Sequence, residues 1–159
     1  MNVLIPTDFT GNSLDSVNSI AKAMPEKMNI ILFHAFDMPE SLLDAMMRKG
    51  MNGHSNLVTE DLRLKCKRIK QQNKHVQNIY FRSMYGTTVA AFRNFAEANA
   101  IALIVLPAGY RYLPTVRESV NPLRMFQKSG IRLVTDLQES EARPDIDNSF
   151  FGGNMAMAN

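Results

Sequence analysis

The stretch IALIVL, residues 101–106, is apolar at every position. A run this short that lacks polar alternation is typical of a strand covered on both faces, as in a parallel sheet. The segment before it, TTVAAFRNFAEANA, has a helical pattern with Thr87 or Thr88 as its N-cap. A buried strand that follows a helix indicates a sheet with helices packed against it.

The same alternation of strand and helix extends over most of the chain. Four further runs have strand character: NVLIP (2–6), NIILFHAF (29–36), VQNIYFRS (76–83) and IRLVTDL (131–137). Between them lie helical patterns, and right-handed crossovers then imply an open, mostly parallel sheet with helices on both faces. The sequence therefore predicts a single α/β domain over residues 1–137, with a five-stranded, doubly wound sheet.

Helical spacing and capping residues place the helices. The first is predicted to begin near Thr10 or Asn12 and to end before Pro25, and its apolar face is formed by Leu14, Val17, Ala21 and Met24. A Met-rich segment at 39–50 is predicted as a short helix, and Leu62, Cys66 and Ile69 mark the longer helix after it. In the segment 121–130 we expect Asn121 as cap, Pro122 at the first helical position and Gly130 just past the end.

Composition excludes several classes of protein. The 159 residues are 45% hydrophobic and 21% charged, and the longest apolar run is too short to cross a bilayer, so we expect a cytoplasmic protein. The single cysteine, Cys66, and the unrelated spacing of the three histidines predict no disulfide and no metal site. The net charge of +3 is mild, and the basic run at 63–74 has no interleaved aromatic residues, so no nucleic-acid partner is predicted. Residues 138–159 form a C-terminal tail without periodicity.

The stretch LPAGYRYLPTVRES, residues 106–119, follows the central strand, where a glycine-rich phosphate loop would lie in a nucleotide-binding α/β domain. It contains one glycine, two prolines and two tyrosines. Proline has no amide donor, and a tyrosine ring fills space that a glycine would leave open. The stretch is therefore a poor match to a phosphate loop.

Three segments of the chain resemble the universal stress protein family. They are NVLIPTDFTGNSLDSV with IILFHAF, then YGTTVAAFRNFAEANAIALIVLPA, and finally SVNPLRMFQKSGIRLVTDL. The resemblance covers about residues 2–137 and implies the family's doubly wound fold, for which we predict the strand order 3-2-1-4-5. Members of that family often form homodimers through the last strand, which here is residues 131–137. That strand would otherwise be an exposed edge.

The resemblance also implies where a nucleotide would lie. Adenine and ribose positions fall on Pro6, Thr7, Asp8 and Ala35. The family's phosphate pattern of glycines followed by Gly-Ser falls on Pro107, Tyr110, Glu118 and Ser119, or on Gly109 and Tyr112 in a shifted register, and neither register restores it. The full set of candidate binding residues is Pro6, Thr7, Asp8, Ala35, Pro107, Gly109, Arg111, Ser119 and Val120.

Two readings of function follow from this pattern. The first is a stress-linked binding or regulatory module that is not an enzyme, has no cofactor and does not bind ATP tightly, because the Glu118 carboxylate would repel phosphate. In this reading the adenine and ribose positions can still hold an adenosine-like or other small ligand. The second is an adenine-nucleotide binder that uses Asp8 for ribose, Arg111 and Arg117 for phosphate, and Mg²⁺. Alternatively, Asp8 caps the first helix. A phospho-acceptor role for Asp8 is disfavoured because no acid follows the central strand.

Overall fold

The computed structural model describes residues 1–37, 41, 44 and 55–135. The predicted helix at 39–50, apart from residues 41 and 44, and the predicted tail at 138–159 lie outside the described residues. The elements in chain order are β1 (Asn2–Pro6), α1 (Gly11–Ala23), β2 (Met28–Phe36), the 3₁₀ turn η1 (Ser55–Leu57), α3 (Glu60–Gln72), β3 (Val76–Tyr85), α4 (Val89–Ala98), β4 (Ile101–Leu106), β5 (Ser119–Val120), α5 (Leu123–Lys128) and β6 (Leu133–Thr135). None of the helices in this described part has both the length and the apolarity needed to cross a bilayer.

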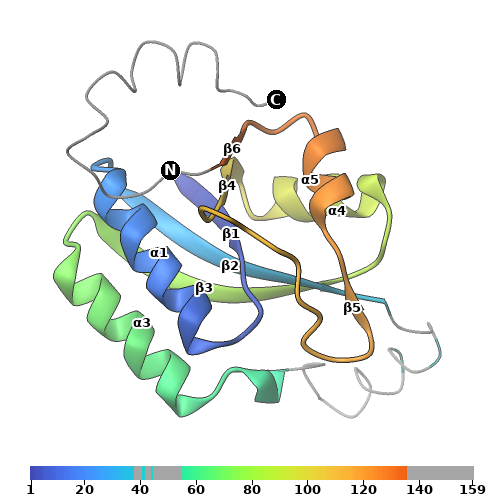
Figure 1. Cartoon of the computed structure of the whole chain (residues 1–159). Helices are drawn as coiled ribbons and strands as arrows, with labels where there is room; N and C mark the ends of the chain where they lie inside the picture. The colour runs from blue at the N-terminus through green and yellow to red at the C-terminus, as the bar shows by residue number, and fades with distance from the viewer. Residues whose placement is uncertain (38–40, 42–43, 45–54, 136–159) are drawn as a thin grey trace.

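The strands form one mostly parallel sheet in the order β3-β2-β1-β4-β6. The predicted order 3-2-1-4-5 is confirmed, because the final strand is β6 once the unpredicted β5 is counted. Helices α1 and α3 cover one face of the sheet, and α4 and α5 cover the other (Figure 1). The order in which strands are added to the sheet reverses between the parallel neighbours β1 and β4, and this switch point is where open α/β sheets bind ligands.

Alternation along the strands builds two cores. Val3 and Ile5 of β1 face α1 and α3, whereas Leu4 between them faces α4 and α5. The run IALIVL is buried except at Ala102, as a strand covered on both faces requires. Cys66 lies in the first core, and burial raises the pKa of its thiol from 9.0 to about 11. The thiolate is therefore scarce at neutral pH.

Threonine caps begin the three longer helices. The side chains of Thr10, Thr59 and Thr88 accept hydrogen bonds from the backbone N–H groups of Ser13, Leu62 and Ala91. These bonds satisfy amides that the first turn of a helix leaves without a partner. Of the predicted alternatives, Thr10 and not Asn12 caps α1, and Thr88 and not Thr87 caps α4.

The predicted start of α5 is wrong by one residue. The helix begins at Leu123 with Pro122 as its cap, and no side chain caps it in the usual way. Asn121 instead accepts a hydrogen bond from the Leu123 N–H at 3.1 Å. Gly130 follows the helix with φ of +86°, a conformation that glycine adopts without strain.

The short strand β5 was not expected. Val120 pairs antiparallel with Ala35, and Ser119 pairs with Phe36. The opposite edge of β2 is paired with β3 as far as Phe36, so β5 lies on the β1 side, beyond the point where Pro6 ends β1. The segment between β4 and β5 is thereby brought over the carboxyl end of β1.

Three asparagine side chains connect β1, β2 and β3. Asn29 Nδ2 donates to Asn2 Oδ1 at 3.0 Å, and Asn78 Nδ2 donates to Asn29 Oδ1 at 3.1 Å. Asn2 Nδ2 in turn donates at 2.8 Å to the carbonyl of Asn99, the residue that follows α4 in the chain. The strand register brings these residues together, because Asn2 pairs with Asn29 and Asn29 pairs with Asn78.

Replacing Asn29 by alanine is expected to lower the free energy of unfolding by about 2 kcal/mol, because it leaves partners on both neighbouring strands unsatisfied in a partly buried place. Urea unfolding followed by circular dichroism measures the loss. The control is Gln77→Ala, an exposed site on β3, which should change stability by less than about 0.5 kcal/mol. Equal effects of the two substitutions would contradict a stabilising role for the asparagine ladder, the hydrogen-bonded side chains of Asn2, Asn29 and Asn78.

Candidate functional site

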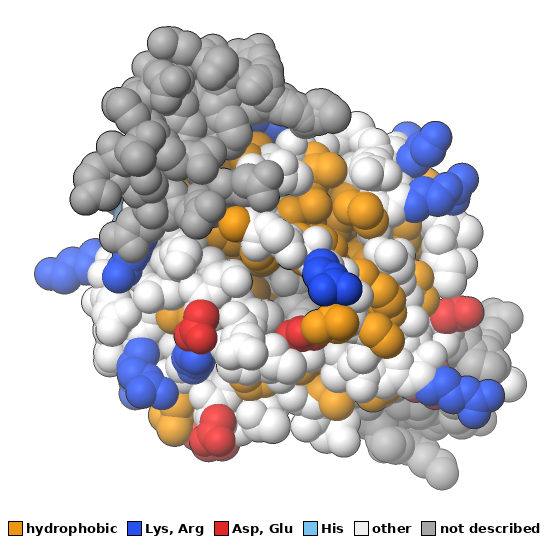
Figure 2. Space-filling view, in the orientation of Figure 1, with side chains coloured by type: hydrophobic (Ala, Val, Ile, Leu, Met, Phe, Trp, Pro, Cys, Tyr) orange, Lys and Arg blue, Asp and Glu red, His pale blue; other side chains and the backbone are white. Residues whose placement is uncertain are grey.

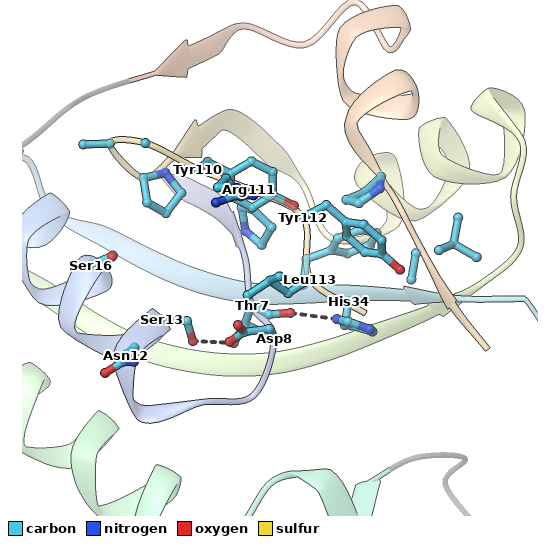
Figure 3. Close-up of a pocket in the computed structure, with 18 residues that line it drawn as sticks. Thr7, Asp8, Asn12, Ser13, Ser16, His34, Tyr110, Arg111, Tyr112 and Leu113 are labelled. Atoms are coloured by element: carbon cyan, nitrogen blue, oxygen red, sulfur yellow. Dashed lines mark hydrogen bonds between the residues drawn. The ribbon is translucent and has the colours of Figure 1, made fainter. Parts of the chain in front are cut away.

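A pocket of about 290 Å³ opens at the carboxyl ends of β1, β2 and β4 (Figure 3). Its walls come from the β1–α1 turn, the first turns of α1, the end of β2 and the loop that follows β4. The lining residues are Pro6, Thr7, Asp8, Asn12, Ser13, Ser16, Phe33, His34, Ala35, Pro107, Ala108, Gly109, Tyr110, Arg111, Tyr112, Leu113, Val120 and Pro122. The volume is at the lower end of the range for small-molecule sites.

The β1–α1 turn forms the floor of the pocket and is held by its own side chains. Thr7 Oγ1 accepts from the Phe9 N–H at 3.0 Å and lies 3.0 Å from Ser13 Oγ. Asp8 Oδ1 accepts from both the N–H and the hydroxyl of Thr10, at 3.1 and 2.6 Å. Asp8 therefore orders the residue that caps α1, which agrees in part with the helix-capping interpretation, and it also lines the pocket.

Phe9 within this turn has a backbone φ of +64°, which is unfavourable for a residue with a side chain. Its ring packs against His34, with centroids 5.1 Å apart, and against Phe81 at 6.0 Å. The two contacts and the bond from its N–H to Thr7 hold the residue in this conformation. The turn is thus fixed before any ligand arrives.

His34 joins β1, β2 and β5. Its Nδ1 lies 2.7 Å from the carbonyl oxygen of Thr7, and its Nε2 lies 2.8 Å from Ser119 Oγ. A carbonyl can only accept, so Nδ1 carries a hydrogen, and in the neutral ring Nε2 is then the acceptor for the Ser119 hydroxyl. The side chain is 5% exposed, so these bonds are shielded from water.

Ser119, the first residue of β5, holds the loop that precedes it. Its Oγ accepts from the backbone N–H groups of Thr115 and Val116, at 3.1 and 3.0 Å. The hydroxyl of Thr115 donates to the carbonyl of Asp8 at 2.9 Å, which fastens the loop to the floor of the pocket. The loop is therefore organised around a side-chain hydroxyl of its own.

The first part of this loop makes a tight turn. The N–H of Tyr110 donates to the carbonyl of Pro107 at 3.0 Å, and Gly109 has φ of +67°, as the third position of a type II turn requires. Tyr110 packs against the second core. Leu113 lies at the pocket with 56% of its surface exposed, and apolar side chains gather on this face of the molecule (Figure 2).

Both tyrosines of the loop are harder to ionise than usual. Burial raises the pKa of Tyr110 from 10.0 to about 12, and the nearby Tyr112 and Asp8 add to the effect. Burial also raises the pKa of Tyr112, and a hydrogen bond with Ser119 opposes the shift. Both hydroxyls are therefore neutral at physiological pH.

Alkaline titration is expected to show Tyr110 ionising near pH 12, with the midpoint isolated as the absorbance difference between the unmodified chain and Tyr110→Phe. Because the folded-state pKa lies above the unfolded value of about 10, stability is fully present below pH 10 and falls as the pH rises towards 12. The Tyr110→Phe variant should lose this part of the fall. A difference midpoint near pH 10 would contradict the burial of this hydroxyl.

All of the candidate binding residues except Ser119 line this one pocket. Ser119 lies behind the wall, bonded to His34. Glu118 does not line the pocket, and its carbonyl accepts from the Asp37 N–H at 2.7 Å. The repulsion of phosphate by Glu118 stays a prediction, whereas Pro107, Tyr110 and Tyr112 of the same loop do line the pocket.

Sequence reasoning missed the wall contributed by α1, namely Asn12, Ser13 and Ser16. Their spacing, with Ser16 one helical turn after Asn12, could have indicated a polar stripe at the start of the helix. His34 lies within the predicted strand 29–36, but its two hydrogen bonds had no signal in the sequence. Within the described residues, no group of three or more His, Cys, Asp or Glu side chains could hold a metal ion.

The fold and the pocket together define a doubly wound α/β domain with a ligand-sized cavity at its switch point. No protein-family model matches the chain, and no curated protein matches it significantly. Among solved structures, the chain has the fold of the universal stress proteins, as the resemblance of its segments predicted.

Two solved structures carry this conclusion. Universal stress protein UspA from Lactobacillus plantarum is similar with a TM-score of 0.55 and 14% identity, over 86% of this chain and 97% of that protein. The hypothetical protein PH0823 is similar with a TM-score of 0.54 and 20% identity, over 88% of this chain and 97% of that protein. At these identities the likeness establishes the fold.

Proposed function

We propose that this chain is a binding or regulatory module of the universal-stress-protein type that takes a small adenosine-like ligand without tight binding of ATP. It acts in the cytoplasm, in response to stress, without catalysing a reaction. The observation that carries the proposal is the composition of the pocket. The residues that the resemblance assigns to adenine and ribose line the pocket. The loop that would hold phosphates instead contributes a proline and two tyrosines to the pocket wall.

Each wall of the pocket suits a different part of such a ligand. Asp8, Asn12 and Ser16 offer hydrogen-bonding groups for ribose hydroxyls or ring nitrogens. Tyr110 and Leu113 offer apolar surface against which a flat ring can pack. Pro107 has no N–H to give to a phosphate oxygen.

Isothermal titration calorimetry tests the proposal. Adenosine is expected to bind with a dissociation constant below about 1 mM, and Mg-ATP should bind no more tightly than adenosine. Asp8→Asn should weaken adenosine binding by about tenfold or more, because it removes a charged acceptor worth about 1.5 kcal/mol. The matched control is Asp15→Asn, whose carboxylate pairs with Lys65 and does not line the pocket.

Micromolar affinity for Mg-ATP, tighter than for adenosine, would refute the proposal. It would favour the second candidate, an adenine-nucleotide binder with a modified phosphate site that uses Arg111 and Mg²⁺. One observation favours that candidate, namely the position of Arg111 in the pocket wall. Mass spectrometry of small molecules that copurify with the chain provides an independent comparison of the two.

We also propose that two copies associate through the last strand. β6 has β4 as its one strand partner among the described residues, so its outer edge offers backbone groups to a second chain. Light scattering of the full chain is expected to give the mass of a dimer. A monomer at high micromolar concentration would count against the association.

A further inference from the structure

We propose that a second cavity, between the β1–α1 turn and α3, binds a small organic carboxylate that carries an apolar group. The cavity has a volume of about 390 Å³, and its described lining residues come from the turn, the start of α1 and residues 59–68. Among the described residues, it shares no lining side chain with the pocket at the carboxyl ends of the strands. The inference is therefore independent of the ligand proposed for that pocket.

Lys65 links the two helices that flank this second cavity. Its Nζ donates to the carbonyl of Gly11, the first residue of α1, at 3.1 Å and lies 2.7 Å from Asp15 Oδ1. The first turns of α1 and α3 consequently lie next to each other (Figure 1). Asp15 balances the charge of Lys65, so this ammonium group mainly holds the wall together.

Arg68 supplies a positive charge that a ligand can use. It follows Lys65 by about one helical turn on α3 and lines the same cavity. Within the part of the chain that the structure describes, no carboxylate or carbonyl pairs with its guanidinium. A guanidinium has five N–H donors in a planar arrangement that matches the two oxygens of a carboxylate. A carboxylate can therefore bind Arg68 without displacing a bond of these described residues.

The rest of the wall is partly apolar. Phe9, Leu62 and Leu64 line the cavity, and Leu64 leaves 47% of its surface exposed. An apolar group placed against Leu64 and the half-buried ring of Phe9 would remove part of this surface from water. An inorganic anion makes no use of such a wall. The combination of Arg68 with these side chains therefore favours a carboxylate that bears an apolar group.

Asp61 in the first turn of α3 also lines the cavity, and its carboxylate opposes an anionic ligand. The repulsion is weakened by salt, because the side chain is exposed. Asp61 and Arg68 thus act on the same ligand with opposite signs. Two substitutions on one helix, each of which removes one charge, are then expected to change the affinity in opposite directions.

An amide NMR titration of the full chain with benzoate tests the inference. Benzoate is expected to shift the signals of Phe9, Gly11 and Leu62, with a dissociation constant below about 5 mM at constant ionic strength. Benzamide has a similar shape without the charge, and acetate has the charge without the ring. Each should bind about fivefold more weakly or worse, because each lacks one of the two features that the wall recognises.

Substitutions on α3 test the assigned residues. Arg68→Gln should weaken benzoate binding by about fivefold or more, and Asp61→Asn should strengthen it by about twofold. Arg63→Gln is the matched control, because it removes the same charge from an exposed position of the same helix that does not line the cavity. It should change the affinity by less than about 1.5-fold.

Several results would overturn the inference. Benzoate shifts that do not saturate would show that no site exists, and shifts confined to residues 107–113 would place benzoate in the other pocket. Equal weakening by Arg68→Gln and Arg63→Gln would show only the general attraction of a basic helix. Equal binding of benzoate and benzamide would also reject the carboxylate preference, and this comparison needs no variant.

Discussion

Replacing Phe33 by alanine is expected to lower the free energy of unfolding by about 3–5 kcal/mol. The ring is fully buried on β2 at the centre of the second core. Its centroid lies 5.5 Å from that of Phe92, 5.0 Å from that of Phe95 and 5.7 Å from that of Phe126. The substitution removes these contacts between the sheet and both α4 and α5, and it leaves a cavity that rigid neighbours cannot fill. Urea unfolding monitored by circular dichroism measures the loss.

Tyr80→Ala is the control for the loss of an aromatic side chain. Tyr80 lies on the edge strand β3 with 38% of its surface exposed, and the Arg82 guanidinium lies 4.7 Å from its ring centroid. Its removal should cost about 0.5–1 kcal/mol. If Phe33→Ala were no more destabilising than Tyr80→Ala, the aromatic cluster would not be the structural centre of that face.

Replacing both Pro107 and Tyr110 by glycine is expected to increase the affinity for Mg-ATP by about tenfold or more. Glycine at 107 adds an N–H that can donate to a phosphate oxygen, a charge-assisted bond worth about 1.5–3 kcal/mol. Glycine at 110 removes a ring from the pocket wall. The double variant should also unfold more readily, because Tyr110 packs against the second core. Calorimetry with Mg-ATP measures the change in affinity.

Adenosine provides the internal control for this double variant. The resemblance assigns adenine and ribose to the side of Asp8 and Ala35, so we expect its affinity to change by less than about threefold. Arg111→Gln in the same background should reverse part of the gain, because it removes a positive charge that lines the pocket. Parallel changes for ATP and adenosine would show that the substitutions altered the whole pocket and not its phosphate side.

Much of the fold could be predicted because it depends on local pattern. The strands around Val3, Ile30 and Ile104 are continuous apolar runs, and such runs are stable only when both faces of a sheet are covered. The threonines that begin α1 and α4 act through bonds to residues three positions away, so their role is visible in a short stretch of sequence. The predicted start of α5 was wrong by one residue, which is within the usual uncertainty of helix ends.

Features that depend on residues far apart in the chain could not be predicted. The asparagine ladder requires the register of three strands, and a shift of one residue would turn its side chains to the opposite face. The short strand β5 has only two paired residues, which is too few for any periodic pattern. The bond between His34 and Ser119 spans 85 positions.

The sequence by itself determined the class of fold and eight of the 18 residues that line the pocket, because the ends of parallel strands must meet at one edge of the sheet. It also indicated that the loop after β4 is poor in glycine. Only the tertiary structure decided that Glu118 lies outside the pocket wall and that Ser119 turns inward to His34. The loop has no repeating pattern to fix the direction of its side chains, so its conformation is set by the pairing of β5 with β2 and by hydrogen bonds to residues on β1 and β2.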